Sequence, residues 1–258
     1  MPDERLTVRQ ALGTRAGPLT VFFRDDDAGW ADERLQTLCS VFGAANVPLD
    51  LAVIPAAITG RTERILNQYC AESPGLFHLH QHGFSHENHQ SAGRKCEFGS
   101  ARSLALQQAD IFRGQCRLRR CFDDRIEPIF TPPWNRCTQQ TVAALEAEGL
   151  SVLSRDIGAT ALRTQRLFEI PVSVDWFRKH NGRRLSADAW EHYAARSFAR
   201  LDAVGVMLHH EIMDANEIGK LNAFLRELRS TGLVVFKSIM EIYRSAKLTP
   251  GLDTMEVH

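Results

Sequence analysis

Short apolar runs rich in β-branched residues recur along this chain, and segments with the periodicity of amphipathic helices lie between several of them. The strand candidates are Leu19–Arg24, Leu49–Ile54, Leu76–His80, Glu127–Phe130, Ser151–Leu153, Leu167–Val172, Gly205–Leu208 and Leu233–Phe236. The helix candidates are 31–44, 61–72, Ser100–Arg117, Thr138–Glu148, Ala187–Leu201 and Ala215–Arg229. A repeated strand–helix order favours a parallel sheet covered by helices, and about eight units suit a (β/α) barrel. An open doubly wound sheet is the alternative, although no G-x-G-x-x-G follows the first strand candidate.

The composition is that of an ordinary soluble globular protein. The 258 residues are 44% hydrophobic, and 31 Lys and Arg balance 31 Asp and Glu, so neither nucleic acid nor a membrane surface is an expected partner. No apolar run approaches the ~20 residues of a membrane span, and the polar N-terminus lacks the apolar core of a secretion signal. We therefore expect a cytoplasmic protein whose six cysteines, none in a C-x-x-C pair, are free thiols.

Polar clusters follow the predicted strands. They are Arg24–Asp27, His80–His86, Thr131–Trp134, Asp175–Trp176 and His209–Glu211. Ligands and catalytic groups in parallel α/β folds gather at the carboxyl edge of the strands, so five clusters at this edge predict one shared site.

Five of the ten histidines lie in the single stretch LFHLHQHGFSHENH. Within it His82 and His86 are four residues apart, a spacing that lets two imidazoles converge on one metal ion. An aspartate from the upstream Asp25–Asp27 run would complete a His-His-Asp ligand set that leaves positions open for water and substrate. The neighbouring carboxylate could then act as a general base, and His209 or His210 as the acid.

These clusters resemble, in order, the motifs of polysaccharide deacetylases, the NodB-like family 4 carbohydrate esterases. FRDDDAG parallels their T-F-D-D-G, HGFSH parallels H-T-x-S-H, and FTPPWNR parallels R-x-P-[PFY]. VSVDW parallels a D-x-x-[DW] segment and VMLHH a strand ending in L-x-H or L-H. The resemblance extends from about residue 20 to about residue 215.

The resemblance implies a distorted (β/α) barrel of seven or eight strands, with residues 1–258 forming a single catalytic domain. It implies that Asp27, His82 and His86 bind the metal, that Asp26 is the catalytic base and that His209 is the general acid, with His210 as the alternative. Leu208 would help line an acyl pocket, and Trp134 or Trp176 would form a wall for a sugar ring. The substrate-binding candidates are thus Trp134, Pro133, Trp176, Asp175, Leu208 and His210.

Three departures from the family pattern matter. The third motif lacks its arginine, which in the family orients the base; Arg24, two residues before Asp26 on one side of an extended strand, is our hypothesis for its replacement. The additional Asp25 leaves the pair open between Asp25–Asp26 and Asp26–Asp27, and we prefer the second. Gly83 stands where the second motif has Ser or Thr.

The resulting functional hypothesis is a hydrolase dependent on a divalent metal, Zn²⁺ before Co²⁺ or Ni²⁺. It would remove an N-acetyl group from an amino sugar in a polysaccharide or in a nucleotide- or lipid-linked glycan precursor. One alternative is another non-peptide C–N amide hydrolase on the same scaffold. The other is a catalytically inactive relative that binds glycans. The oligomeric state is not predicted.

Overall fold

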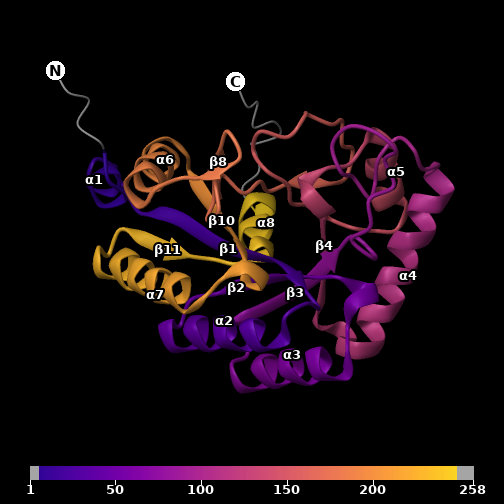
Figure 1. The fold of residues 1–258 in the computed structure, drawn as a ribbon, viewed down its shortest axis with the longest axis horizontal. Coiled ribbons are helices and arrows are strands. Elements are labelled where there is room, and N and C mark those ends of the chain that lie inside the picture. The colour runs from indigo at the N-terminus through magenta and orange to yellow at the C-terminus, as the bar shows by residue number, and fades with distance from the viewer. Residues whose placement is uncertain (1–5, 249–258) are drawn as a thin grey trace.

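The computed structural model describes residues 6–248 and builds them around one curled parallel sheet (Figure 1). Its strands are β1 (Leu19–Ala28), β2 (Leu49–Val53), β3 (Phe77–His82), β4 (Ile126–Thr131), β5 (Val152–Leu153), β6 (Phe168–Glu169), β7 (Val174–Asp175), β10 (Ala203–His209) and β11 (Val234–Phe236). A separate antiparallel pair consists of β8 (Lys179–His180) and β9 (Arg183–Arg184).

The strand order is β6-β5-β4-β3-β2-β1-β10-β7, with every pair in this sheet parallel. One edge of β1 serves two partners, because β11 pairs with Leu19–Val21 and β2 pairs further along. The sheet curls into an incomplete barrel, which confirms the predicted distorted (β/α) fold.

Helices cover the outer side of this curl and alternate with the strands, as predicted. They are α1 (Val8–Gly13), α2 (Asp32–Ala45), α3 (Gly60–Glu72), α4 (Leu104–Phe122), α5 (Gln139–Ala147), α6 (Ala187–Arg200) and α7 (Ala215–Ser230). Helix α8 (Ile239–Leu248) instead begins against the inner side of the curl, and its residues after Met240 are exposed or half-buried. Its Ile239 and Met240 pack among inward side chains of the sheet such as Phe22, Ile129 and Met207.

The observed elements differ from the predicted ones in several places. Strand β1 continues through the acidic run to Ala28, and β7 is an additional strand beyond Val172. Helices α1 and α8 were not predicted; α1 has only six residues, and Thr7 caps it by accepting from the amide of Gln10.

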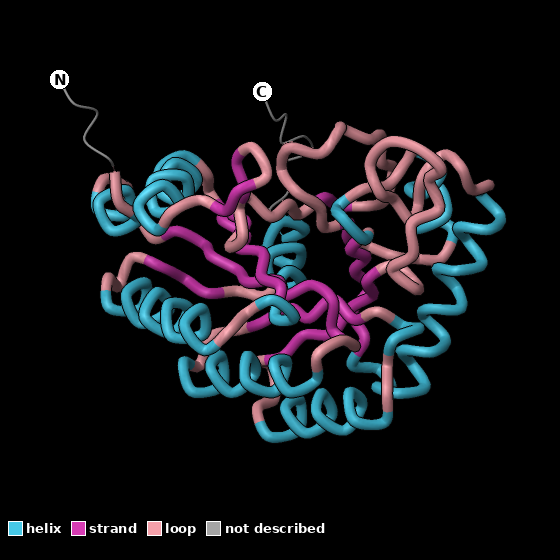
Figure 2. Tube along the Cα trace, in the orientation of Figure 1, coloured by secondary structure: helices cyan, strands magenta, loops and turns pink. Residues whose placement is uncertain are grey.

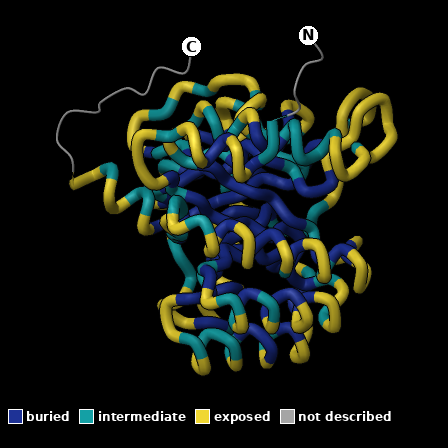
Figure 3. The backbone as a smooth tube through the Cα atoms, turned by 90° about the vertical axis from the view of Figure 1, so that its left-hand side faces the viewer, coloured by how far each residue is buried: buried dark blue, intermediate teal, exposed yellow. Residues whose placement is uncertain are grey.

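The core lies between the sheet and its outer helices, where the buried residues concentrate (Figure 3). Long loops follow β3 and β5 and gather on one side of the molecule (Figure 2). No helix among residues 6–248 is long and apolar enough to cross a membrane.

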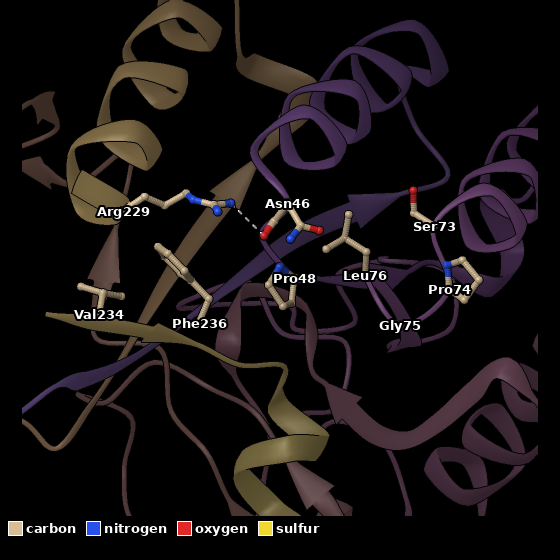
Figure 4. Close-up of a pocket in the computed structure, with 9 residues that line it drawn as sticks. All are labelled: Asn46, Pro48, Ser73, Pro74, Gly75, Leu76, Arg229, Val234 and Phe236. Atoms are coloured by element: carbon tan, nitrogen blue, oxygen red, sulfur yellow. Dashed lines mark hydrogen bonds between the residues drawn. The ribbon is translucent and has the colours of Figure 1, made fainter. Parts of the chain in front are cut away.

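A surface hollow of about 640 Å³ lies at the opposite end of the strands from the polar clusters (Figure 4). It is lined by residues that precede β2 and β3 and by residues of β11, among them Asn46, Pro48, Gly75 and Phe236. Arg229 closes one side by donating to the backbone carbonyl of Asn46 at 3.2 Å. None of the predicted site residues lines this hollow.

Candidate metal and catalytic site

The end of β1 turns two adjacent carboxylates toward the same side of the sheet. Strand alternation places Phe23 in the core against the outer helices, and it places Arg24 and Asp26 on the inner side. Asp27 would then point outward, but its φ of 71° breaks the alternation, and the β1–β2 register shifts between Asp25 and Ala28. Asp26 and Asp27 therefore both face the inside of the barrel, and a local backbone distortion makes this arrangement possible.

Asp27, His82 and His86 form a compact group that can hold a metal ion. Their ligand atoms all lie within 4.8 Å of one another. The Nε2 atoms of His82 and His86 lie 3.2 and 3.1 Å from the same oxygen, Asp27 Oδ1. His82 donates its Nδ1–H to the Thr131 carbonyl at 2.9 Å, which leaves Nε2 with the lone pair that a metal needs. The donor set therefore fits a divalent cation that accepts nitrogen and oxygen ligands.

Electrostatic coupling within this group is strong. Burial opposes ionisation of Asp27, but hydrogen bonds from His82 and His86 hold the pKa of its carboxyl far below the usual range. For His82, burial favours the neutral ring, but the contact with Asp27 outweighs it and raises the pKa. A cation that bound to this group would therefore displace the proton from a protonated histidine nitrogen.

A buried carboxylate that the sequence did not indicate, Glu97, organises the loop that carries His86. Glu97 Oε1 accepts from the amides of Phe84 and Ser85 at 3.1 and 2.8 Å. Oε1 also accepts from the Ser85 hydroxyl at 3.2 Å, and Oε2 accepts from the amide of His86 at 3.2 Å. Gly83, at φ 55°, lies so close that an added Cβ would clash with Glu97 and approach Pro133 to 2.6 Å. Glycine at this motif position is therefore required by the packing, and Glu97 takes over the loop contacts.

Two tryptophans flank the His86 imidazole. The Trp134 ring lies 4.4 Å from it and the Trp30 ring 4.9 Å, both between centroids. Both tryptophans are partly exposed, so Trp134 remains the candidate wall for a sugar, and Trp30 is a second candidate beside it.

Arg24 holds Asp26 through a bidentate ion pair. Its Nε donates to Asp26 Oδ1 at 2.7 Å and its Nη2 donates to Oδ2 at 2.9 Å, with both side chains almost fully buried. Ser154 and Asn135 accept from the remaining guanidinium donors at 2.9 and 2.8 Å. Burial opposes the charge on Asp26, but Arg24, His82 and His209 together keep its pKa below the usual value.

His209 is the last residue of β10 and the register partner of Asp26 on the adjacent strand. Its Nδ1 is buried and has no hydrogen-bond partner among the described residues. Asp175, at the end of the next strand, is close enough for its carboxyl to interact with the charge of His209. Burial raises the pKa of Asp175, which caps the following turn by accepting from the amide of Phe177 at 2.8 Å.

His210 belongs to a different, structural network. Its ring is fully buried, with Nδ1 2.6 Å from Asp25 Oδ2 and Nε2 donating to the carbonyl of Trp30 at 2.8 Å. Burial disfavours the imidazolium, but Asp25 outweighs it and raises the pKa of His210 to about 9. Both nitrogens of His210 are occupied, so it has no free atom for substrate or proton transfer. Asp25 is hydrogen-bonded to His210 and is not part of the metal group. The geometry thus favours the Asp26–Asp27 register and His209.

Three further substrate-binding candidates, Leu208, Trp176 and Pro133, are buried and pack against other parts of the protein. Leu208 points into the core under the outer helices, because alternation along β10 turns Met207 and His209 inward instead. Trp176 is 5% exposed, donates to Glu217 at 2.8 Å and packs edge-to-face against Trp190. Pro133 is buried against Gly83 and supports the loop.

Neither the comparison with family models nor that with curated proteins gives a match to this chain. Solved structures do match it. A protein from Mycobacterium smegmatis classed as a polysaccharide deacetylase has a TM-score of 0.69 at 18% identity, covering 95% of this chain and 96% of that one. A family 4 acetyl xylan esterase from Clostridium thermocellum, in complex with a cobalt ion, has a TM-score of 0.60 at 14% identity, covering 90% and 93%.

A CE4 family pseudoenzyme from Bacillus anthracis is also similar, with a TM-score of 0.58 at 12% identity, covering 88% of this chain and 66% of that one. The shared fold therefore accommodates both enzymes and inactive relatives, and identity this low shows the fold alone. The chain has the fold of the CE4 polysaccharide deacetylases and esterases, as the order of its motifs predicted.

Proposed function

We propose that this protein is a metal-dependent hydrolase that removes an N-acetyl group from an amino sugar. The observation that carries the proposal is the convergence of Asp27, His82 and His86 on one point, with Asp26 and His209 beside it on neighbouring strands. The substrate would be a polysaccharide or a nucleotide- or lipid-linked precursor. Zn²⁺ is the first candidate ion, with Co²⁺ or Ni²⁺ as alternatives.

The chain's own residues account for the proton transfers. A divalent cation held by Asp27, His82 and His86 would supply Lewis acidity toward the acyl oxygen and lower the pKa of a nearby water. Asp26 is ionised and held rigidly by Arg24, so it can accept the proton of the attacking water as a general base. His209, across the adjacent strand, can donate a proton to the departing amine.

Asp175 would act through His209. Its half-buried carboxyl lies at the end of β7, in register with Met207 on the strand that carries His209, so it can help to hold the His209 ring in position. Trp30 and Trp134 border the metal group and offer apolar faces to a sugar ring.

Ester hydrolysis is the second candidate, because the similar structure from Clostridium thermocellum is named an acetyl xylan esterase. The same residues would act, with a sugar hydroxyl leaving in place of an amine. His209 matters less for this reaction, because an alkoxide needs less help to leave than an amine anion does.

The test is acetate release by zinc-loaded protein from N-acetylated chito-oligosaccharides and from O-acetylated xylan. We expect release from the first, its loss in Asp26→Asn, and its loss after chelation with recovery on adding zinc. The matched control is His180→Gln, an exposed histidine on the β8–β9 hairpin. Tight zinc binding without release from any substrate would contradict the enzyme proposal and favour a glycan-binding protein. Failure of the wild type to bind zinc, cobalt or nickel would contradict it entirely.

A further inference from the structure

Three cationic side chains gather beside the metal group on two loops that pack together. Arg94 and Lys95 lie in the loop after β3, and Arg136 lies in the loop after β4. Arg136 Nη1 donates to the backbone carbonyl of Lys95 at 2.8 Å, which joins the two loops. The Lys95 ammonium lies 5.9 Å from the centre of the Trp134 ring.

Trp134 connects these cations to the candidate site. The Lys95 ammonium lies over its ring, and the same ring packs against the His86 imidazole with 4.4 Å between the ring centroids. A single aromatic side chain thus separates the ammonium from a metal ligand. A group attached to a sugar on Trp134 would reach the cations while its acyl group lay at the metal.

Carboxylates do not neutralise this cluster. Within residues 6–248, no ion pair includes Arg94, Lys95 or Arg136. Glu97, two residues after Lys95, turns inward to the His86 loop. Burial and then the like charge of Arg94 lower the pKa of Arg136.

This charge excess is local, because the whole chain is formally neutral. Guanidinium groups bind phosphate and carboxylate oxygens in a planar, often bidentate geometry, and an ammonium adds a point charge. We propose that Arg94, Lys95 and Arg136 form a subsite for an oxyanion of the carbohydrate substrate, namely a phosphoryl or carboxylate group next to the acylated sugar. This inference rests on the proposed function. The protein would thereby select anionic glycans or glycan precursors over neutral ones.

The test measures binding without turnover, so that it is independent of the proposed reaction. Zinc-loaded protein is titrated calorimetrically with neutral N-acetylglucosamine, with N-acetylglucosamine 1-phosphate and with N-acetylmuramic acid, at low and at high salt. At low salt we expect at least one anionic sugar to bind tenfold or more tightly than the neutral one, and we expect salt to remove most of the difference. The anion that is preferred identifies the source of the oxyanion.

The variant carrying Arg94→Gln, Lys95→Gln and Arg136→Gln should lose this preference and bind the neutral sugar within twofold of the wild type. The control carries Arg119→Gln, Arg120→Gln and Arg244→Gln, three exposed arginines of α4 and α8 that remove the same charge elsewhere. Equal loss in both variants would overturn the subsite, because a general field effect would explain it. Unchanged binding in the first variant would also overturn it. Cluster-dependent binding by a protein that releases no acetate would support the subsite and contradict only the proposed reaction.

Discussion

Replacing Glu97 with glutamine should weaken zinc binding by roughly 10- to 100-fold while leaving the fold intact. Four hydrogen bonds from Phe84, Ser85 and His86 end on its two carboxylate oxygens. A glutamine side chain keeps one acceptor oxygen, but its amide nitrogen would face a donor in place of the other. The change therefore removes at least one hydrogen bond to a charged acceptor, worth about 1.5–3 kcal/mol.

That loss falls on metal binding because the hydrogen bonds that the Glu97 carboxylate accepts come from the loop that carries His86. A loop that is less ordered without metal must be ordered when the ion binds, and the ordering cost appears in the dissociation constant. At about 1.4 kcal/mol per tenfold change, 1.5–3 kcal/mol corresponds to the stated range. The effect should be largest on the ligand nearest the contact, His86.

The assay is competition for zinc with a chelator of known affinity, with circular dichroism to confirm folding. Glu87→Gln is the matched control, because Glu87 is an exposed carboxylate on the same loop with none of these contacts. Gly83→Ala disturbs the same contact from the other side, because its Cβ would clash with Glu97 and Pro133, and it should weaken zinc binding as well. Zinc affinities of Glu97→Gln and Glu87→Gln within twofold of each other would refute the reasoning.

Three further predictions follow from the buried ion pairs. Arg24→Ala should destabilise the protein by about 3–5 kcal/mol in denaturant unfolding and should reduce acetate release at least 100-fold. If Arg24→Ala kept its activity while Asp26→Asn lost it, Arg24 would not orient the proposed base. His209→Gln should lower kcat by about 10²–10⁴-fold and leave the unfolding midpoint unchanged. His210→Gln should instead lower the unfolding midpoint, because it leaves Asp25 buried without its partner, and the opposite pattern would reverse the assignment of the two histidines. Burial disfavours charge on His78, but Glu127 outweighs this effect and raises the pKa of His78 from 6.5 to about 9, so the pair stabilises the fold fully below pH 6.5 and loses its effect as pH rises through 9. The difference in unfolding free energy between wild type and Glu127→Gln should be at most about 3 kcal/mol near pH 6 and should shrink by pH 10. A difference that stays constant with pH would contradict this prediction.

Periodicity sufficed to predict most of the helices and strands that position the site. Leu35, Leu38 and Phe42 share one face of α2 and are all buried, as their spacing indicates. The proximity of His82 and His86 was also predictable, because a spacing of four residues at a strand end is a local signal. Their convergence with Asp27 follows from the parallel topology, which brings the ends of β1 and β3 to the same edge.

Contacts that depend on tertiary structure left no comparable signal. Glu97 lies 11 residues beyond His86, and only the folded path of the intervening loop brings it back to the His86 amide. Leu208 was misplaced because strand alternation, rather than proximity to His209 in the sequence, decides which side chain lines the barrel. The left-handed backbone at Asp27 favours Asp26–Asp27 within the ambiguous acidic run, and a non-glycine residue at φ 71° is not predictable from an Asp-Asp-Asp string.

In the proposed site, Arg24 takes the place of the missing motif arginine, and its contacts fit this role. Residues 24 and 26 lie on the same face of one strand, so the guanidinium reaches Asp26 within its own strand and needs no loop to position it. The loop after β4, where the family motif carries its arginine, contributes Asn135 as an acceptor to the same guanidinium. Asn135 lies at φ 57°, a conformation that asparagine tolerates better than most residues. The connection between the first and third motifs is therefore retained, with donor on the strand and acceptor on the loop. Asn135→Ala should consequently impair Asp26 less than Arg24→Ala does, because it removes one support of the arginine and leaves the bidentate pair in place.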